Sequence, residues 1–184
     1  MSHSNDYLEE LKLLHNKKTF GTASNIPNEV KELIENQSIN SVLDFGAGKG
    51  LTSSALKSNY NINVYTYDPV TFPIKLPDQV DLVYSSDVLE HVEPNLINRT
   101  LEDLSHRAQL YQYHLIACHP AKKSLSDGRN AHLIIKPPAW WKEKISNLSN
   151  WKIVHEEVRE WTAKVKKGPP RDIVKYIVLL KKCT

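Results

Sequence analysis

The sequence predicts an α/β fold with a doubly wound sheet. Short apolar segments of strand composition alternate with helical patterns between residues 41 and 117, which is typical of parallel β-α-β units. The last two apolar segments, 151–158 and 173–180, have no helix between them and predict a closing antiparallel pair. We therefore expect a mostly parallel sheet with an antiparallel last strand.

The length and the absence of repeats or linkers predict one domain. A chain of 184 residues with 40% hydrophobic residues is large enough to bury a single core. We expect residues 1–184 to form one domain, in which residues 1–38 are a helical cover and residues 39–184 are the α/β core.

Two amphipathic helices are expected before the first strand. The first covers 6–17, where Tyr7, Leu11 and Leu14 follow helical spacing. The second begins near Pro27, with Ser24 or Asn25 as a capping residue. Its apolar face consists of Val30, Leu33 and Ile34.

The α/β core is expected to contain four further strands and three helices. The strands are 41–45, 62–67, 81–85 and 111–117, and the helices are 50–58, 95–106 and one that begins at Pro137-Pro138 and buries Trp141, Ile145 and Leu148. The segment 69–77 contains three prolines and cannot form a full helix.

Composition and charge limit the classes of function. The two cysteines, Cys118 and Cys183, lack metal-ligand spacing, and no stretch of about 18 apolar residues occurs. With no signal-peptide pattern at its start, the chain is expected to be cytoplasmic and without a membrane contact. Residues 1–92 are net acidic and residues 93–184 net basic, a division that fits an anionic partner but is more typical of solvated surface.

A glycine-rich turn follows the first predicted strand. Three of the six glycines fall within the segment Asp44-Phe45-Gly46-Ala47-Gly48-Lys49-Gly50. Glycines here permit a tight strand-to-helix turn and allow a ligand to lie against bare backbone. An ordinary turn of this kind needs only one glycine, so the segment predicts a binding site.

The residues around the turn favour S-adenosylmethionine over a dinucleotide. A dinucleotide fingerprint requires a third glycine where this chain has Leu51. Asp44 would repel a pyrophosphate but could accept hydrogen bonds from the ammonium group of the methionine portion. Asp68, at the end of the next strand, is placed to accept both ribose hydroxyls.

At these motifs the sequence resembles the class I, Rossmann-like methyltransferases over roughly residues 40–181. The resemblance rests on the glycine turn, on Tyr65-Thr66-Tyr67-Asp68 and on the segment 81–92, which contains Ser86-Asp87-Val88-Leu89-Glu90-His91. It implies S-adenosyl-L-methionine as cofactor and a Rossmann-like methyltransferase sheet. In one departure from the family pattern, the segment 69–77 leaves little room for the helix and third strand that usually follow the acidic strand end, so we expect a sheet shortened around its third strand. The cofactor-binding residues that it implies are Asp44, Phe45, Gly46, Ala47, Gly48, Asp68, Pro69, Asp87 and Val88, with Phe20 as a cover and Val70 and Phe72 as candidates for the adenine pocket.

The resemblance also implies where catalysis occurs. The family places residues that face the methyl group and the substrate after the fourth strand, which here gives Asp87 and His91, with His132 on a later loop. His91 could remove the proton from a substrate hydroxyl, because imidazole titrates near neutral pH. Its alternative role is to pack or cap the turn. The expected substrate-binding residues are His91, Arg129, Asn130, His132 and Trp140.

A divalent metal is a further hypothesis. Asp87-x-x-Glu90-His91 with His132 is similar to the metal-dependent O-methyltransferases of small-RNA ends and of the ubiquinone pathway. By that resemblance Asp87, Glu90, His91 and His132 would hold the ion, with His119 replacing a histidine that the pattern lacks. The alternative is that no metal is bound.

The sequence is compatible with three classes of function. The first is a methyltransferase that acts on a hydroxyl of a small molecule or glycan, with RNA as another possible acceptor. The second is a non-catalytic module that binds S-adenosylmethionine and acts as a scaffold or activating partner. The third, an NAD-dependent reductase, is disfavoured by Leu51. The basic segment 164–171 fits a solvated hairpin tip as well as a phosphate contact.

Overall fold

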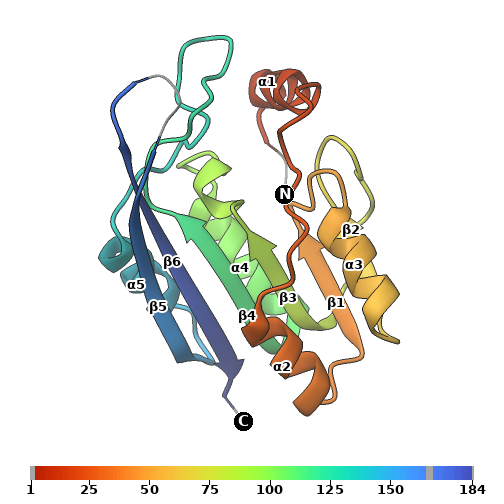
Figure 1. Cartoon of the computed structure of the whole chain (residues 1–184). Helices are drawn as coiled ribbons and strands as arrows, with labels where there is room; N and C mark the ends of the chain where they lie inside the picture. The colour runs from red at the N-terminus through yellow and green to blue at the C-terminus, as the bar shows by residue number, and fades with distance from the viewer. Residues whose placement is uncertain (1–2, 165–167, 184) are drawn as a thin grey trace.

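Six strands form one sheet in the computed structural model, which describes residues 3–164 and 168–183 (Figure 1). The strand order is β2-β1-β3-β4-β6-β5. The strands are β1 (Ser41–Phe45), β2 (Asn63–Tyr67), β3 (Val80–Ser86), β4 (Ala108–Ala117), β5 (Trp151–Ala163) and β6 (Arg171–Lys182). The first four are parallel, and β6 pairs antiparallel with both β4 and β5. The expected mostly parallel sheet with an antiparallel last strand is confirmed.

Helices cover both faces of this sheet. They are α1 (Asn5–His15), α2 (Asn28–Asn36), α3 (Leu51–Asn59), α4 (Ile97–Arg107) and α5 (Pro138–Ser146), with a short 3-10 helix η1 (Leu89–His91). In Figure 1, α2 and α3 lie on the near face, and α4 and α5 lie behind the sheet. This arrangement gives the sheet a separate apolar core on each side.

The apolar faces expected from the helical spacing are buried. Val30, Leu33 and Ile34 of α2 pack with Leu56 of α3 in the first core. In the second core, Trp141 of α5 is fully buried, together with the inner face of α4. The expectation that Ser24 or Asn25 caps α2 is wrong. Pro27, in an extended conformation, is the residue that flanks the helix, and no side chain caps it.

The sheet is short at the β2 edge, as expected. Between β2 and β3 the chain makes turns and a single bridge between Asp68 and Phe72, with no helix and no further strand. The strands at the other edge are longer than expected, because β5 extends to Ala163 and β6 to Lys182. Their ladder continues through exposed polar residues, which an apolar pattern does not detect. Residues 165–167 of the basic segment 164–171 lie outside the described residues.

Helix α1 lies above the carboxyl ends of the parallel strands, away from both faces of the sheet (Figure 1). It buries Tyr7, Leu11 and Leu14 against Leu125 and Ala131 of the segment that follows β4. Ser4 caps the helix and also donates a hydrogen bond to Glu93, just beyond η1. Among the described residues, no helix is long and apolar enough to cross a bilayer.

Candidate functional site

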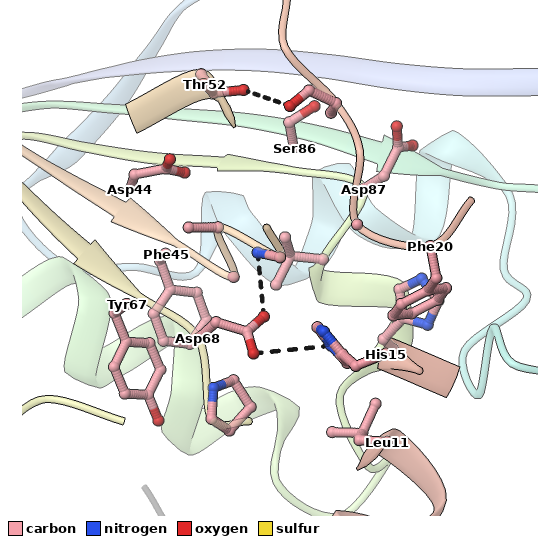
Figure 2. Close-up of a pocket in the computed structure, with 18 of the residues that line it drawn as sticks. Leu11, His15, Phe20, Asp44, Phe45, Thr52, Tyr67, Asp68, Ser86 and Asp87 are labelled. Atoms are coloured by element: carbon pink, nitrogen blue, oxygen red, sulfur yellow. Dashed lines mark hydrogen bonds and ion pairs between the residues drawn. The ribbon is translucent and has the colours of Figure 1, made fainter. Parts of the chain in front are cut away.

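A cavity of about 290 Å³ lies at the carboxyl ends of β1, β2 and β3, beneath α1 (Figure 2). Its floor is formed by the glycine turn and by the last residues of these strands. Its walls come from α1, from residues 19–23 (the 19–23 strap) and from the segment 86–92. Open α/β sheets bind ligands in this position, because the crevice opens where the strand order reverses.

The glycine turn has the conformation that its composition predicted. Gly46, Gly48 and Gly50 all have positive φ, at 78°, 56° and 72°. The backbone N–H groups of Gly46 and Ala47 both donate to the carbonyl oxygen of Tyr67, at 2.8 Å. A methyl group on Gly48 would lie 2.6 Å from Cα of Gly21 in the 19–23 strap. The turn is therefore packed between β2 and the strap.

Asp44 is a buried carboxylate at the end of β1. Its Oδ2 accepts a hydrogen bond of 2.6 Å from the Ser53 hydroxyl of α3. Burial raises the pKa of Asp44 to about 6, an effect that the Ser53 hydrogen bond partly offsets. Since desolvation penalises the charged form, a cationic ligand in the cavity would stabilise this carboxylate.

Asp68 is the second buried carboxylate, at the end of β2. It accepts hydrogen bonds from the backbone N–H groups of Gly48, Val70 and Thr71, at 3.1, 2.9 and 3.0 Å. These bonds fix the carboxylate at the cavity wall. Beside it, the rings of Phe45 and Tyr67 stack with centroids 5.3 Å apart.

The segment after β3 brings Asp87 and Val88 to the cavity. Asp87 has a φ of 54°, and its Oδ2 lies 2.7 Å from Nζ of Lys175 on β6. The methyl groups of Val88 lie against Gly46, where an added Cβ would be 2.4 Å away. The ion pair directs the Asp87 carboxylate toward β6.

Three further side chains form a cluster beside the cavity, which His91 lines. Glu90, His91 and His132 each offer a ligand atom within 4.8 Å of the others. Glu90 is fully buried, neither of its carboxylate oxygens has a hydrogen-bond partner among the described residues, and burial raises its pKa well above the usual range. His91 Nδ1 lies 2.7 Å from the carbonyl oxygen of Ala131, and His132 Nδ1 lies 2.6 Å from that of His119. Each histidine is thus held through Nδ1, and Nε2 of His132 lies 3.9 Å from Oε1 of Glu90.

Burial has a large effect on His91. It lowers the pKa of His91 to about 3, and the neighbouring His132 adds to this effect. The imidazole is therefore neutral across the physiological range. A neutral imidazole with one nitrogen fixed by a carbonyl group is the form that binds metals.

Of the expected substrate-binding residues, His91 lines the cavity, whereas His132 lies behind it in the cluster and three others lie elsewhere. Arg129 forms an exposed ion pair of 2.6 Å with Asp127. The Asn130 side chain bonds to the backbone of Ala121, and Trp140 packs edge-on against Trp141. His119 is engaged by the carbonyl oxygen of Val174 and is not among the three clustered ligand residues. Of the four expected metal ligands, Asp87 lies outside this cluster.

Several site residues were not identified from the sequence. His15 and Tyr7 of α1 line the cavity, as does Phe20, which was expected. Tyr7 donates from its hydroxyl to the carbonyl oxygen of His91. Helical spacing places Tyr7 on the buried face, but it gives no signal that this face covers a cavity. Lys175 lies 88 residues from Asp87 in sequence, so that pairing required the fold.

Comparison with known proteins identifies the fold. No family model and no curated protein sequence matches the chain. Among solved structures, the chain resembles the 1,6-didemethyltoxoflavin-N1-methyltransferase of Burkholderia thailandensis, with a TM-score of 0.65 and 13% identity over 100% of this chain and 92% of that one. It also resembles the putative methyltransferase in complex with the Haloferax volcanii Trm112 methyltransferase activator, with a TM-score of 0.63 and 12% identity over 99% and 98% of the two chains.

A third similar structure is that of DhpI in complex with SAH (S-adenosylhomocysteine), with a TM-score of 0.58 and 15% identity over 98% of this chain and 99% of that one. These likenesses cover at least 98% of this chain and at least 92% of each of the other chains. They establish that the chain has the Rossmann-like fold of the class I methyltransferases.

Proposed function

We propose that the protein is a methyltransferase that uses S-adenosylmethionine. The observation that carries the proposal is the placement of two buried carboxylates, Asp44 and Asp68, on either side of a glycine turn with an open cavity above it. Asp44 is suited to the ammonium group of the methionine portion, and Asp68 to a ribose hydroxyl. The non-catalytic binding module is less favoured, because the cavity extends past Asp87 to His91.

The chain's own residues would act mainly by positioning. Once bound, S-adenosylmethionine would supply an activated methyl group for transfer to an acceptor oxygen. The glycine turn and the 19–23 strap, which line the cavity together, would hold the donor, and His91 would face the acceptor. Alignment of the reacting atoms contributes much of the acceleration in such displacements. A hydroxyl acceptor on a small molecule or glycan is our preferred assignment, with RNA as the alternative.

Calorimetric titration with S-adenosylhomocysteine tests the cofactor assignment. We expect micromolar binding that Asp68→Asn weakens at least tenfold and that Asp172→Asn, an exposed carboxylate on β6, leaves unchanged. NAD serves as a negative ligand control. Binding of NAD in place of S-adenosylhomocysteine, or equal affinity in the two variants, would contradict the proposal.

The cluster of Glu90, His91 and His132 favours a divalent cation as a second component. A carboxylate that is fully buried without a hydrogen-bond partner is costly, and a cation would remove that cost. Two neutral imidazoles with fixed orientation complete a donor set suited to manganese or zinc. We therefore propose that these three residues hold the ion, which would lower the pKa of an acceptor hydroxyl bound to it. With a pKa of about 3, His91 is better suited to this role than to that of a free base.

Metal binding can be measured without turnover. Protein stripped with EDTA should bind about one equivalent of Mn²⁺ or Zn²⁺ by calorimetry and gain thermal stability. Glu90→Gln should abolish both effects, whereas Glu160→Gln, on the exposed part of β5, should retain them. An unchanged melting temperature with metal, or equal binding by both variants, would refute the site. Full methylation activity in the stripped protein would refute a catalytic role for the metal.

A further inference from the structure

We propose that His15, the last residue of α1, forms a two-sided clamp with Asp68 that binds one ribose hydroxyl of the adenosyl ligand. The inference rests on the proposed function and extends it to a residue outside the α/β core. It would make α1 part of the cofactor site and not only its cover.

His15 is positioned to contact a ligand in the cavity. Its side chain is 6% exposed and lines the cavity. Figure 2 shows the ring directed at Asp68, with His15 Nε2 3.7 Å from Oδ1 of the carboxylate. This distance is too long for a hydrogen bond, so the two groups face each other without being bonded.

The imidazole of His15 also lacks hydrogen-bond partners among the described residues. Within the part of the chain that the structure describes, neither nitrogen of the His15 ring makes a hydrogen bond, and Nδ1 is the fully buried one of the two. Buried polar groups are nearly always paired, since an unpaired one loses its hydration without compensation. A nine-tenths buried histidine that faces a cavity therefore indicates a ligand group.

The chemistry of His15 and Asp68 indicates which ligand group would lie between them. A carboxylate has about four acceptor positions. Oδ1 of Asp68 accepts from Val70 and Thr71 and Oδ2 accepts from Gly48, so one position remains, on Oδ2. An anion at this place would be repelled by Asp68. An ammonium group could not accept a hydrogen bond from His15. A hydroxyl satisfies both residues, because it donates to the carboxylate and accepts from the imidazole N–H.

The protonation of His15 agrees with this role. Burial lowers its pKa, an effect that the nearby Asp68 opposes. A neutral imidazole retains one N–H donor for the hydroxyl. Phe20 holds the ring on its other side through an edge contact, with centroids 4.9 Å apart.

The test uses a substitution that keeps the ring and removes its nitrogens. S-adenosylhomocysteine and its 2′-deoxy and 3′-deoxy analogues are titrated into wild-type protein, His15→Phe and His155→Phe, the last being an exposed histidine on β5. Thermal unfolding establishes that each variant is folded. We expect His15→Phe to bind S-adenosylhomocysteine about tenfold more weakly, and His155→Phe to bind it as wild type does.

The deoxy ligands identify the contact. The analogue that lacks the clamped hydroxyl should bind wild type and His15→Phe equally, because the group that His15 recognises is gone. Wild-type affinity in His15→Phe, or a tenfold loss that is the same for all three ligands, would overturn the assignment of His15 alone. Failure of the wild-type protein to bind S-adenosylhomocysteine would overturn the cofactor proposal and this inference with it.

Discussion

Replacement of Gly48 by alanine, compared with replacement of Gly128, should distinguish the cost of overpacking the glycine turn from the cost of a positive φ. Gly48 has a φ of 56°, and an added Cβ would lie 2.6 Å from Cα and 2.7 Å from the carbonyl oxygen of Gly21. Both neighbours are backbone atoms, so the 19–23 strap itself would have to move. Gly128 is a matched control, with a φ of 90° and no atom within 4 Å of an added Cβ.

The two glycine substitutions differ in magnitude. A left-handed alanine costs about 1–2 kcal/mol, and overpacking adds about 1–3 kcal/mol. Gly48→Ala should therefore destabilise the fold by about 3 kcal/mol and Gly128→Ala by about 1–2 kcal/mol.

Chemical denaturation measures the difference, and titration with S-adenosylhomocysteine should show weaker binding only for Gly48→Ala. Equal unfolding free energies with equal affinities would refute the view that the strap is packed directly on the turn.

Three further predictions concern buried groups. Burial lowers the pKa of His114 to about 4. Between pH 6.5 and pH 4 the unfolded chain therefore binds a proton at His114 that the folded protein does not. The free energy of unfolding should fall by up to about 3 kcal/mol as the pH falls through this range. His114→Gln should flatten this part of a denaturation-against-pH curve, and an unchanged slope would contradict the cause. Trp141→Ala should cost about 3–5 kcal/mol and Trp161→Ala, 48% exposed, under about 1 kcal/mol in urea unfolding. Tyr7→Phe, which removes the hydrogen bond to His91, should cost about 1 kcal/mol and speed proteolysis within α1; a wild-type cleavage rate would argue that this bond does not hold α1.

The sheet and its glycine turn could be predicted because the information is local. The segment 41–50 carries both the apolar strand and the glycines that its turn requires, and Trp141 follows the helical spacing of a core residue. The prolines of 69–77 excluded a full helix, and comparison with the family pattern then predicted that the helix and strand which usually follow the acidic strand end are absent here.

The remaining parts of the site depend on contacts between distant segments. The Asp87–Lys175 ion pair joins β3 to β6, and the approach of His15 to Asp68 joins α1 to β2. The polar composition of the loop after β4 also led us to expect substrate-binding residues there that the structure does not bring to the cavity. Arg129 is dense in donors, but its neighbour Asp127 engages it at the surface. Residue type predicted what such a side chain can bind, whereas its geometry decided what it does bind.

The shortened sheet has a consequence for how the protein avoids aggregation. Both edge strands present unpaired backbone groups that another chain could join. At one edge β2 is only five residues long and is followed by Pro69, Pro73 and Pro77, which cannot extend a ladder. At the other edge β5 is thirteen residues long, and its outer half carries the charges of Glu156, Glu157, Arg159 and Glu160. Pairing with another chain is thus disfavoured at the β2 edge by the short strand and its prolines, and at the β5 edge by charged side chains.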